Sequence, residues 1–277
     1  MSLTKEEINQ LNTRCHTFRK DVVRVLHDKQ TGHPGGSLSV CEILTVLYFK
    51  EMRVNPQNPN KPDRDRLVLS KGHAAPMLYR VLAEKGYFPV EEMNTFRDFE
   101  TRLQGHPNVL DLPGIDMSAG PLGIGLSAGL GMAIALRMQK YDSRVYVVLG
   151  DGELNEGTNW EAAMAAAKFE VDNLCAILDW NGVQLDGPTA EIMPMGDIQL
   201  KFDAFGWNTI PCDGHDVDAL YAAMEEAKTV KGRPTIILAH CVKGKGVSFM
   251  EGQSAWHGKP IDDEHYAIAM KILGGAE

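Results

Sequence analysis

The sequence lacks the features that mark secreted proteins, membrane proteins and proteins with cysteine-bound metal sites. Its 277 residues include only five cysteines, scattered and without the spacing of a metal site: Cys15, Cys41, Cys175, Cys212 and Cys241. We expect them to be buried free thiols in a reducing compartment. No apolar run approaches the length that spans a membrane, and the N-terminus lacks the apolar core of a signal peptide. These absences predict a soluble, cytoplasmic protein that does not bind membranes.

Excess positive charge is also missing. The 28 Lys and Arg residues are outnumbered by 37 Asp and Glu, and the formal net charge of −9 argues against a nucleic-acid-binding surface. Hydrophobic residues make up 44% and charged residues 23%, an ordinary globular composition. We find no internal repeat and no low-complexity linker, so residues 1–277 are expected to form a single domain.

Short apolar runs alternate with amphipathic segments along the chain. Strands are expected at 66–70, 144–149, 174–179, 207–210 and 234–239. Helices are expected at 4–30, 39–50, 73–85, 91–99, 126–138, 159–169, 195–205, 217–230 and 262–273, with residues 32–37 forming a rigid glycine-rich loop. This alternation predicts an α/β fold, doubly wound, with a mainly parallel sheet and helices on both faces.

Polar side chains follow two of these strands. Asp151 lies between two glycines directly after strand 144–149, and Asn181 follows strand 174–179. The carboxyl ends of neighbouring parallel strands lie side by side, where open α/β sheets bind ligands. Carboxylate and amide oxygens suit Mg²⁺, and so few of them leave positions for ligand phosphates. Gly-Asp-Gly alone is more often a turn; the partner Asn181 favours a binding site.

These motifs resemble a known family. Gly150-Asp-Gly152 followed by Asn181 is similar to the diphosphate and magnesium signature of thiamine-diphosphate enzymes. The segments 153–157, 256–260 and 120–123 narrow the resemblance to transketolases, whose N-terminal half is matched along nearly the whole chain. The resemblance implies a thiamine-diphosphate-binding fold of the diphosphate type. The implied cofactors are thiamine diphosphate and Mg²⁺, with Ca²⁺ or Mn²⁺ as possible substitutes.

The resemblance also assigns roles to residues. Metal ligands are implied to be Asp151, Asn181 and the carbonyl of Val183. Cofactor contacts are implied for His73, Gly120, Leu122, Asp151, Gly152, Glu153, Asn181, Lys243 and His257. The implied catalytic residues are His33, His106, His257 and Glu156. The three histidines would act on sugar oxygens, since imidazole titrates near neutral pH. From local sequence alone, Gly-His-Pro at 32–34 and 105–107 could be bare turns, and Lys243 could be a surface lysine.

Transketolases transfer a two-carbon ketol unit from a ketose phosphate to an aldose phosphate, through a carbanion and enamine of the cofactor, in the pentose phosphate pathway. The family's pyrimidine-binding domain, which supplies a catalytic glutamate and phosphate-binding arginines, is not in this chain. We therefore expect an N-terminal subunit that is inactive alone. A C-terminal subunit would complete each site, Glu156 would lie at their interface, and two copies of each would form a heterotetramer. The last residues, Gly274–Glu277, are typical of a finished C-terminus.

Three alternatives stay open from the sequence. A 2-oxo-acid dehydrogenase subunit would share Gly-Asp-Gly and the asparagine but has no reason to carry the Gly-His-Pro loops. A deoxyxylulose-phosphate-synthase-like enzyme, which joins pyruvate to a sugar phosphate, is the nearer alternative. A non-catalytic regulatory module that kept the fold is the third, because fold alone does not determine function.

Overall fold

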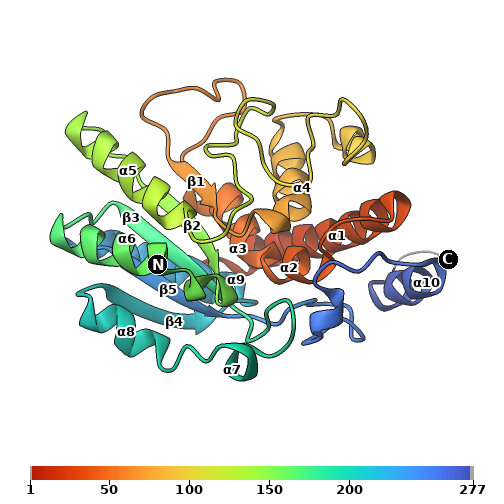
Figure 1. The fold of residues 1–277 in the computed structure, drawn as a ribbon. Coiled ribbons are helices and arrows are strands. Elements are labelled where there is room, and N and C mark those ends of the chain that lie inside the picture. Colours follow the sequence, from red (N-terminus) through yellow and green to blue (C-terminus); the bar gives the residue numbers. More distant parts are fainter. Residues whose placement is uncertain (1, 275–277) are drawn as a thin grey trace.

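A five-stranded parallel sheet forms the centre of the computed structural model, which describes residues 2–274. The expectation for the C-terminal end falls largely on residues 275–277, outside the described residues. The strands are β1 (Arg66–Leu69), β2 (Val145–Gly150), β3 (Leu174–Trp180), β4 (Asn208–Asp213) and β5 (Thr235–His240). They are ordered β1-β2-β3-β5-β4, and every neighbouring pair is parallel (Figure 1). The doubly wound α/β prediction is confirmed.

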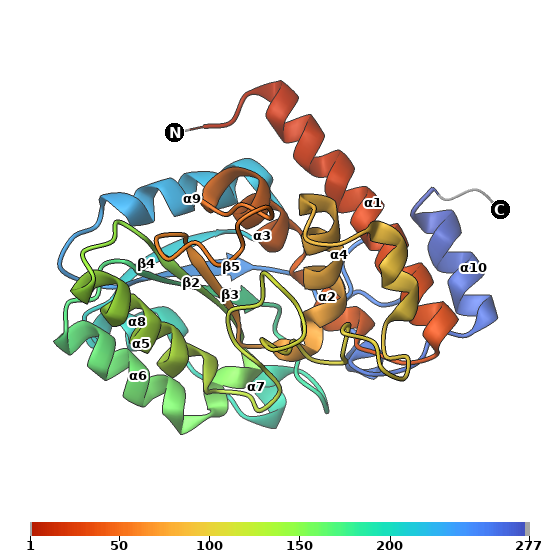
Figure 2. The same ribbon diagram turned by 90° about the horizontal axis from the view of Figure 1, so that it is seen from above.

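Helices cover both faces of the sheet (Figure 2). On one side lie α1 (Lys5–Lys29), α3 (Cys41–Val46), α4 (Ala75–Lys85) and α9 (Val217–Thr229); on the other lie α5 (Gly125–Met138), α6 (Gly157–Lys168) and α8 (Ile198–Ala204). The remaining helical segments are α2 (Pro34–Ser39), η1 (Leu47–Glu51), η2 (Gly72–Ala74), η3 (Val90–Thr95), η4 (Gly152–Asn155), α7 (Thr189–Ile192), η5 (Ser254–Trp256) and α10 (Asp263–Ile272).

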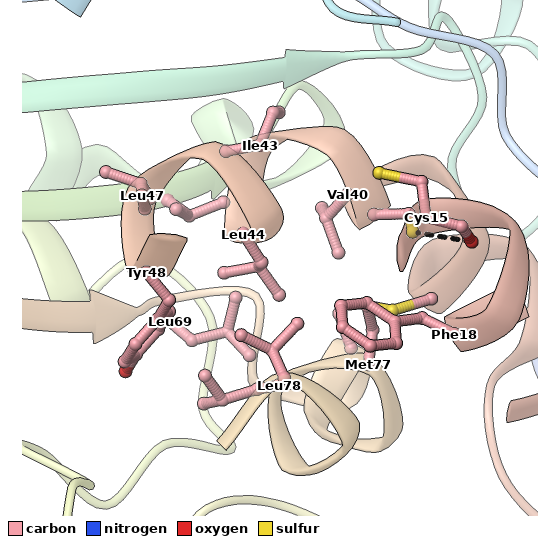
Figure 3. Close-up of a cluster of buried hydrophobic side chains, with 14 of the residues drawn as sticks. Cys15, Phe18, Val40, Ile43, Leu44, Leu47, Tyr48, Leu69, Met77 and Leu78 are labelled. Carbon is pink, nitrogen blue, oxygen red and sulfur yellow. Dashed lines mark hydrogen bonds between the residues drawn. The ribbon is translucent and has the colours of Figure 1, made fainter. Parts of the chain in front are cut away.

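The central strands divide the core into two layers because successive side chains point to opposite faces of a sheet. In β2, Tyr146 and Val148 join the cluster under α1, α3 and α4, whereas Val145 and Val147 join the cluster under α5 and α6. Figure 3 shows part of the first cluster, in which Phe18 of α1 packs with side chains of α3 and α4. Strands buried on both faces read as continuous apolar runs, which is why the sequence revealed them.

Several predicted boundaries were wrong. Residues 34–37, predicted as part of a rigid loop, lie in the helix α2, with proline at its first position, where the missing N–H costs nothing. The predicted helix 39–50 is interrupted at Val40 and ends in the π-helical segment η1. The predicted helix 91–99 is a 3₁₀ segment that stops at Thr95. Strand 207–210 begins at Asn208 and continues to Asp213.

Glycines in α2 serve close packing rather than flexibility, which explains the misassigned loop. A Cβ on Gly36 would lie 2.9 Å from Nε2 of His73, and one on Gly35 would lie 2.9 Å from the carbonyl oxygen of Trp256. Trp256 itself is buried beside Phe249 and His265. The segment after η5 is therefore anchored in the protein.

The expectation of buried free thiols is largely confirmed. All five cysteines are free thiols, and four of them are buried. Within residues 2–274, no helix combines the length and the apolar character needed to cross a membrane.

Candidate active site

The carboxyl ends of four strands deliver polar side chains to one cavity of about 320 Å³. Lys71 and His73 follow β1, Asp151 follows β2, Asn181 follows β3, and Lys243 follows β5. The sequence-predicted residues that line this cavity are His73, Leu122, Asp151, Gly152, Glu153, Glu156, Asn181, Val183, Lys243 and His257. A larger, more open hollow of about 680 Å³ lies along α1 and is lined mainly by residues of that one helix. We place the site at the strand ends, where groups from four strands converge.

Asp151 is buried at the base of the cavity and is tied down by backbone amides. One carboxylate oxygen accepts from the N–H of Gly182 at 2.7 Å, and the other accepts from the N–H of Gly152 at 3.0 Å. Burial, and then the charge of nearby Asp179, raise the pKa of Asp151 to about 6. Asn181 lies beside it, with its side-chain oxygen accepting from the N–H of Val183 at 3.1 Å. A cation at this point would relieve the crowding of negative charge.

Lys243 brings positive charge to the same cavity. Its ammonium donates to the carbonyl of Val183 at 3.1 Å and lies 3.0 Å from Nδ1 of His257. Burial, and then the charge of Lys71, lower the pKa of Lys243 to about 8. An anion entering the cavity would stabilise the charged form of this lysine.

Lys71 is a site residue that the sequence reasoning missed. Its buried ammonium forms an ion pair with Asp179 at the end of β3 and lies 3.5 Å from the hydroxyl of Ser39. A lysine immediately before Gly72-His73, at the end of a strand, was the available signal. With Lys243 it makes the cavity attractive to a diphosphate despite the negative net charge of the chain.

Four histidines predicted from separate motifs meet here. The ring centroid of His33 lies 5.4 Å from those of His73 and His257 and 5.9 Å from that of His106. His73 and His257 are 5.0 Å apart. Burial first, and then neighbouring cations, lower the pKa of His33 to about 4 and that of His257 to about 3, and also lower those of His73 and His106.

The two predicted glutamates differ in their surroundings. Glu153 is buried, and its carboxylate accepts from the N–H of Gly123 at 2.8 Å, from that of Gly150 at 3.1 Å, and from the hydroxyl of Ser70. It therefore braces the loops around the cavity. Glu156 is exposed at the cavity wall, before α6.

Three predicted residues lie beyond the cavity wall. His33, His106 and Gly120 are absent from the described lining, although His33 and His106 adjoin His73 and His257 through the ring contacts above. Nδ1 of His33 is buried and has no hydrogen-bond partner among the described residues. An unpartnered buried nitrogen next to a cavity is suited to bind a ligand hydroxyl.

This arrangement defines an α/β domain that binds a phosphorylated cofactor at the ends of parallel strands. Residues 12–276 match the family model for the transketolase, thiamine diphosphate binding domain. The chain belongs to the transketolase family and is an N-terminal, thiamine-diphosphate-binding subunit of a transketolase.

Similar proteins include whole subunits and longer chains. The chain is 43% identical to a 6-deoxy-6-sulfo-D-fructose transketolase subunit of Clostridium sp. strain MSTE9, with 98% of each chain covered. It is 39% identical to one of the subunits of an apulose-4-phosphate transketolase of Phocaeicola vulgatus, with 96% of this chain and 94% of that one covered. Human transketolase is 40% identical, but the match spans 93% of this chain and only 41% of that protein.

The fold is shared with solved structures. Transketolase from Pichia stipitis in complex with sedoheptulose 7-phosphate superposes with a TM-score of 0.91 at 33% identity, covering 96% of this chain and 41% of that one. The chain thus corresponds to less than half of a full-length transketolase.

Proposed function

We propose that this cavity binds thiamine diphosphate with Mg²⁺ and that the chain, completed by a partner subunit, transfers two-carbon ketol units between sugar phosphates. The observation that carries this proposal is the convergence of Asp151, Asn181 and the Val183 carbonyl with two lysines and four histidines at one sheet edge.

The residues present fit a divalent metal and a diphosphate. Asp151, Asn181 and the Val183 carbonyl would hold Mg²⁺, as hard oxygens that leave coordination positions for phosphate; Ca²⁺ or Mn²⁺ would also suit them. Gly152 permits close approach of the backbone, since a Cβ there would lie 2.8 Å from Cβ of Gln184. Lys71 and Lys243 would neutralise the diphosphate, and the uncharged ring of His73 would donate a hydrogen bond to it. Gly120 and Leu122 would line the pyrimidine ring, with Glu153 bracing the loop behind them.

When bound, the cofactor supplies a carbon nucleophile that accepts the two-carbon unit. The chain's own groups orient the sugar. The partly buried, uncharged imidazoles of His33, His106 and His257 can each donate one hydrogen bond and accept another, so they can hold sugar hydroxyls and move protons between them. Their lowered pKa values keep them uncharged at neutral pH.

A partner subunit is part of the proposal. The chain is similar along its length to proteins named as transketolase subunits, and it matches less than half of full-length transketolases. The partner would supply the pyrimidine-binding domain with its catalytic glutamate, and Glu156 would face it. Two copies of each subunit, in the cytoplasm, are the expected assembly. The free, mostly buried thiols support a reducing compartment.

The substrate proposed is an anionic sugar. The two relatives named above are named for a sulfonated fructose and for a sugar phosphate, so both are named for a sugar that carries an anionic group. We therefore propose a ketose phosphate or sulfonate as donor and an aldose phosphate as acceptor.

Co-purification from the native source, followed by assay of the complex and of the chain alone, tests the function. We expect ketol transfer only in the complex, and only with thiamine diphosphate and Mg²⁺. Full turnover by the chain alone would contradict the need for a partner. Turnover of pyruvate with a sugar phosphate would favour the synthase, and oxidative decarboxylation of a 2-oxo acid would favour the dehydrogenase.

Asp151→Asn separates a catalytic subunit from a regulatory module. The amide keeps the shape of the side chain but removes the charge that holds Mg²⁺. Mutating a residue that only hydrogen-bonds to a metal ligand lowers metal affinity or activity about 10–100-fold. Asp151 would bind the metal directly, so we expect at least about a 100-fold loss of cofactor-dependent activity in the complex. Asp142→Asn, exposed at the opposite edge of the sheet, is the control and should keep full activity. Unchanged activity of Asp151→Asn would favour a module without catalytic function.

A further inference from the structure

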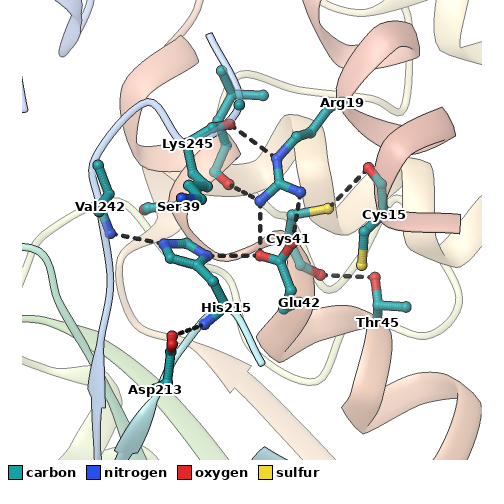
Figure 4. Close-up of polar contacts among 12 residues, drawn as sticks. Cys15, Arg19, Ser39, Cys41, Glu42, Thr45, Asp213, His215, Val242 and Lys245 are labelled. Atoms are coloured by element: carbon teal, nitrogen blue, oxygen red, sulfur yellow. Dashed lines mark hydrogen bonds and ion pairs between the residues drawn. The ribbon is translucent and has the colours of Figure 1, made fainter. Parts of the chain in front are cut away.

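A buried polar cluster lies outside the cavity and joins three elements. Arg19 of α1 donates to both oxygens of Glu42 in α3, at 2.5 and 2.7 Å. Nδ1 of His215, in the turn between β4 and α9, lies 2.9 Å from the same carboxylate (Figure 4). The three side chains are 9%, 6% and 12% exposed, respectively. Burial alone would raise the pKa of Glu42, but His215 and Arg19 outweigh it and lower that pKa.

The cluster holds both ends of one turn. The N–H of Val242 donates to Nε2 of His215 at 2.8 Å, and Nε of Arg19 donates to the carbonyl of Lys245 at 2.9 Å (Figure 4). The turn also packs tightly on Arg19, because a Cβ on Gly246 would lie 2.9 Å from Cδ of Arg19. The residues between these two attachments include Lys243.

The same turn is tied to the helix that follows His33. The N–H of Gly244 donates to the carbonyl of Gly35 at 3.0 Å, and Arg19 also donates to the carbonyl of Leu38 at 3.3 Å. The cluster is therefore attached to the Lys243 turn and to α2, the helix that begins directly after His33.

The hydrogen bonds define one tautomer of His215. Because the Val242 amide can only donate, Nε2 of His215 must accept, so the ring proton is on Nδ1 and is donated to Glu42. The imidazole thus connects the Arg19–Glu42 ion pair to the backbone of the Lys243 turn, with one hydrogen bond at each ring nitrogen. A metal ion is a poor alternative here: Cys15, Cys41 and Glu42 are close enough to share one, but Arg19 already occupies both oxygens of Glu42.

We propose that Arg19, Glu42 and His215 are positioning residues, which clamp the turn 242–245 so that the ammonium of Lys243 is aimed at the diphosphate. This inference rests on the proposed function. The clamp acts from outside the cavity, and it holds the Lys243 turn through the backbone of Val242 and Lys245.

Two variants of His215 separate positioning from mere stability. In His215→Asn the amide nitrogen takes about the place of Nδ1 and can still donate to Glu42, but the contact to Val242 is lost. In His215→Gln the amide oxygen takes about the place of Nε2 and can still accept from Val242, but the contact to Glu42 is lost. Each variant loses one hydrogen bond, so their stabilities should fall by similar amounts.

We expect the dissociation constant of thiamine diphosphate, measured by calorimetry on the complex with Mg²⁺, to rise about fivefold or more in His215→Asn. This change corresponds to one hydrogen bond of about 1 kcal/mol. In His215→Gln it should stay within about twofold. Arg19→Lys keeps the charge near Glu42 but loses the bond to Lys245, so its dissociation constant should rise as in His215→Asn. It replaces His215→Asn in the test if that variant does not fold.

The outcomes are distinct. Equal cofactor affinities in the two His215 variants, or an affinity loss that follows the fall in melting temperature in all three variants, would overturn the clamp. Absence of cofactor binding and turnover in the wild-type complex would instead contradict the proposed function.

Discussion

At the scale of single residues, the main feature of the site is that its four histidines are kept unprotonated. Four imidazoles are packed within about 6 Å of a neighbour beside Lys71 and Lys243, so a proton on any of them would meet both desolvation and positive charge. The uncharged ring is the state that can both donate and accept a hydrogen bond. The burial and positive charge that keep the rings uncharged also oppose their protonation in the folded protein, so acid should destabilise the fold.

Lowering the pH should therefore destabilise the cofactor-free chain. An unfolded histidine takes up a proton near pH 6.5, whereas folded His33 resists protonation until about pH 4, so the unfolded state binds more protons between these values. Stability is lost as the pH falls through this window. In His33→Asn the loss between pH 7 and 5, measured by urea unfolding, should shrink by on the order of 1 kcal/mol after allowing for solvent screening.

His27→Asn is the control of opposite sign. Burial opposes protonation of His27, but its hydrogen bonds to Asp263 and Asp28 raise its pKa. His27 therefore adds stability at low pH that is lost as the pH rises, and removing it should make the loss on acidification steeper. A variant of His33 that behaves like His27→Asn would contradict the account of the histidine cluster.

At the scale of helices and strands, the packing of a helix on the sheet depends on small residues. α5 crosses β2 so closely that a Cβ on Gly129 would lie 2.4 Å from Cγ2 of Val147. Two residues further along the same helix, a Cβ on Gly131 would meet nothing within 4 Å. The two glycines share a helix and differ only in what faces them.

Alanine at these two positions should have opposite effects. Gly129→Ala should destabilise the chain by about 1–3 kcal/mol, because overpacking forces α5 away from the sheet. Gly131→Ala should be neutral or stabilising by up to about 1 kcal/mol, because alanine favours the helix. Denaturant unfolding of both variants checks this, and equal effects would show that α5 can shift without cost.

At the scale of the whole molecule, the site is open to solvent, and exposed apolar side chains lie at its opening. Leu122 and Leu185 line the cavity and are 40% and 61% exposed. Exposed apolar side chains around a site that binds a cofactor are typical of a surface that another chain covers. This fits the proposal that a partner subunit completes the site.

Leu185→Asp should weaken assembly with the partner. A buried, unpaired carboxylate in an interface is costly, so we expect the dissociation constant of the complex to rise at least about tenfold, as measured by analytical ultracentrifugation. Met138→Asp is the matched control: it is 78% exposed but lies at the end of α5 that leads to the opposite edge of the sheet. Equal effects of the two substitutions would place the interface elsewhere.

Much of the fold and site was evident from local sequence. Buried parallel strands appear as apolar runs, and Asp151 and Asn181 stand directly after two of them, so their shared edge followed from topology alone. The motifs around His33, His73, His106 and His257 were each visible, although only the resemblance to transketolases assigned them to one site.

Tertiary structure decided what depends on contacts between distant segments. Glycines at 35 and 36 are compatible with a loop or a helix, and packing against Trp256 and His73 determined that they lie in α2. Lys71 became a site residue through its ion pair with Asp179, 108 residues away. The His215 clamp likewise joins residues 19, 42, 215 and 242, because a buried charge is stable only where its partners meet it, and no local pattern records that meeting.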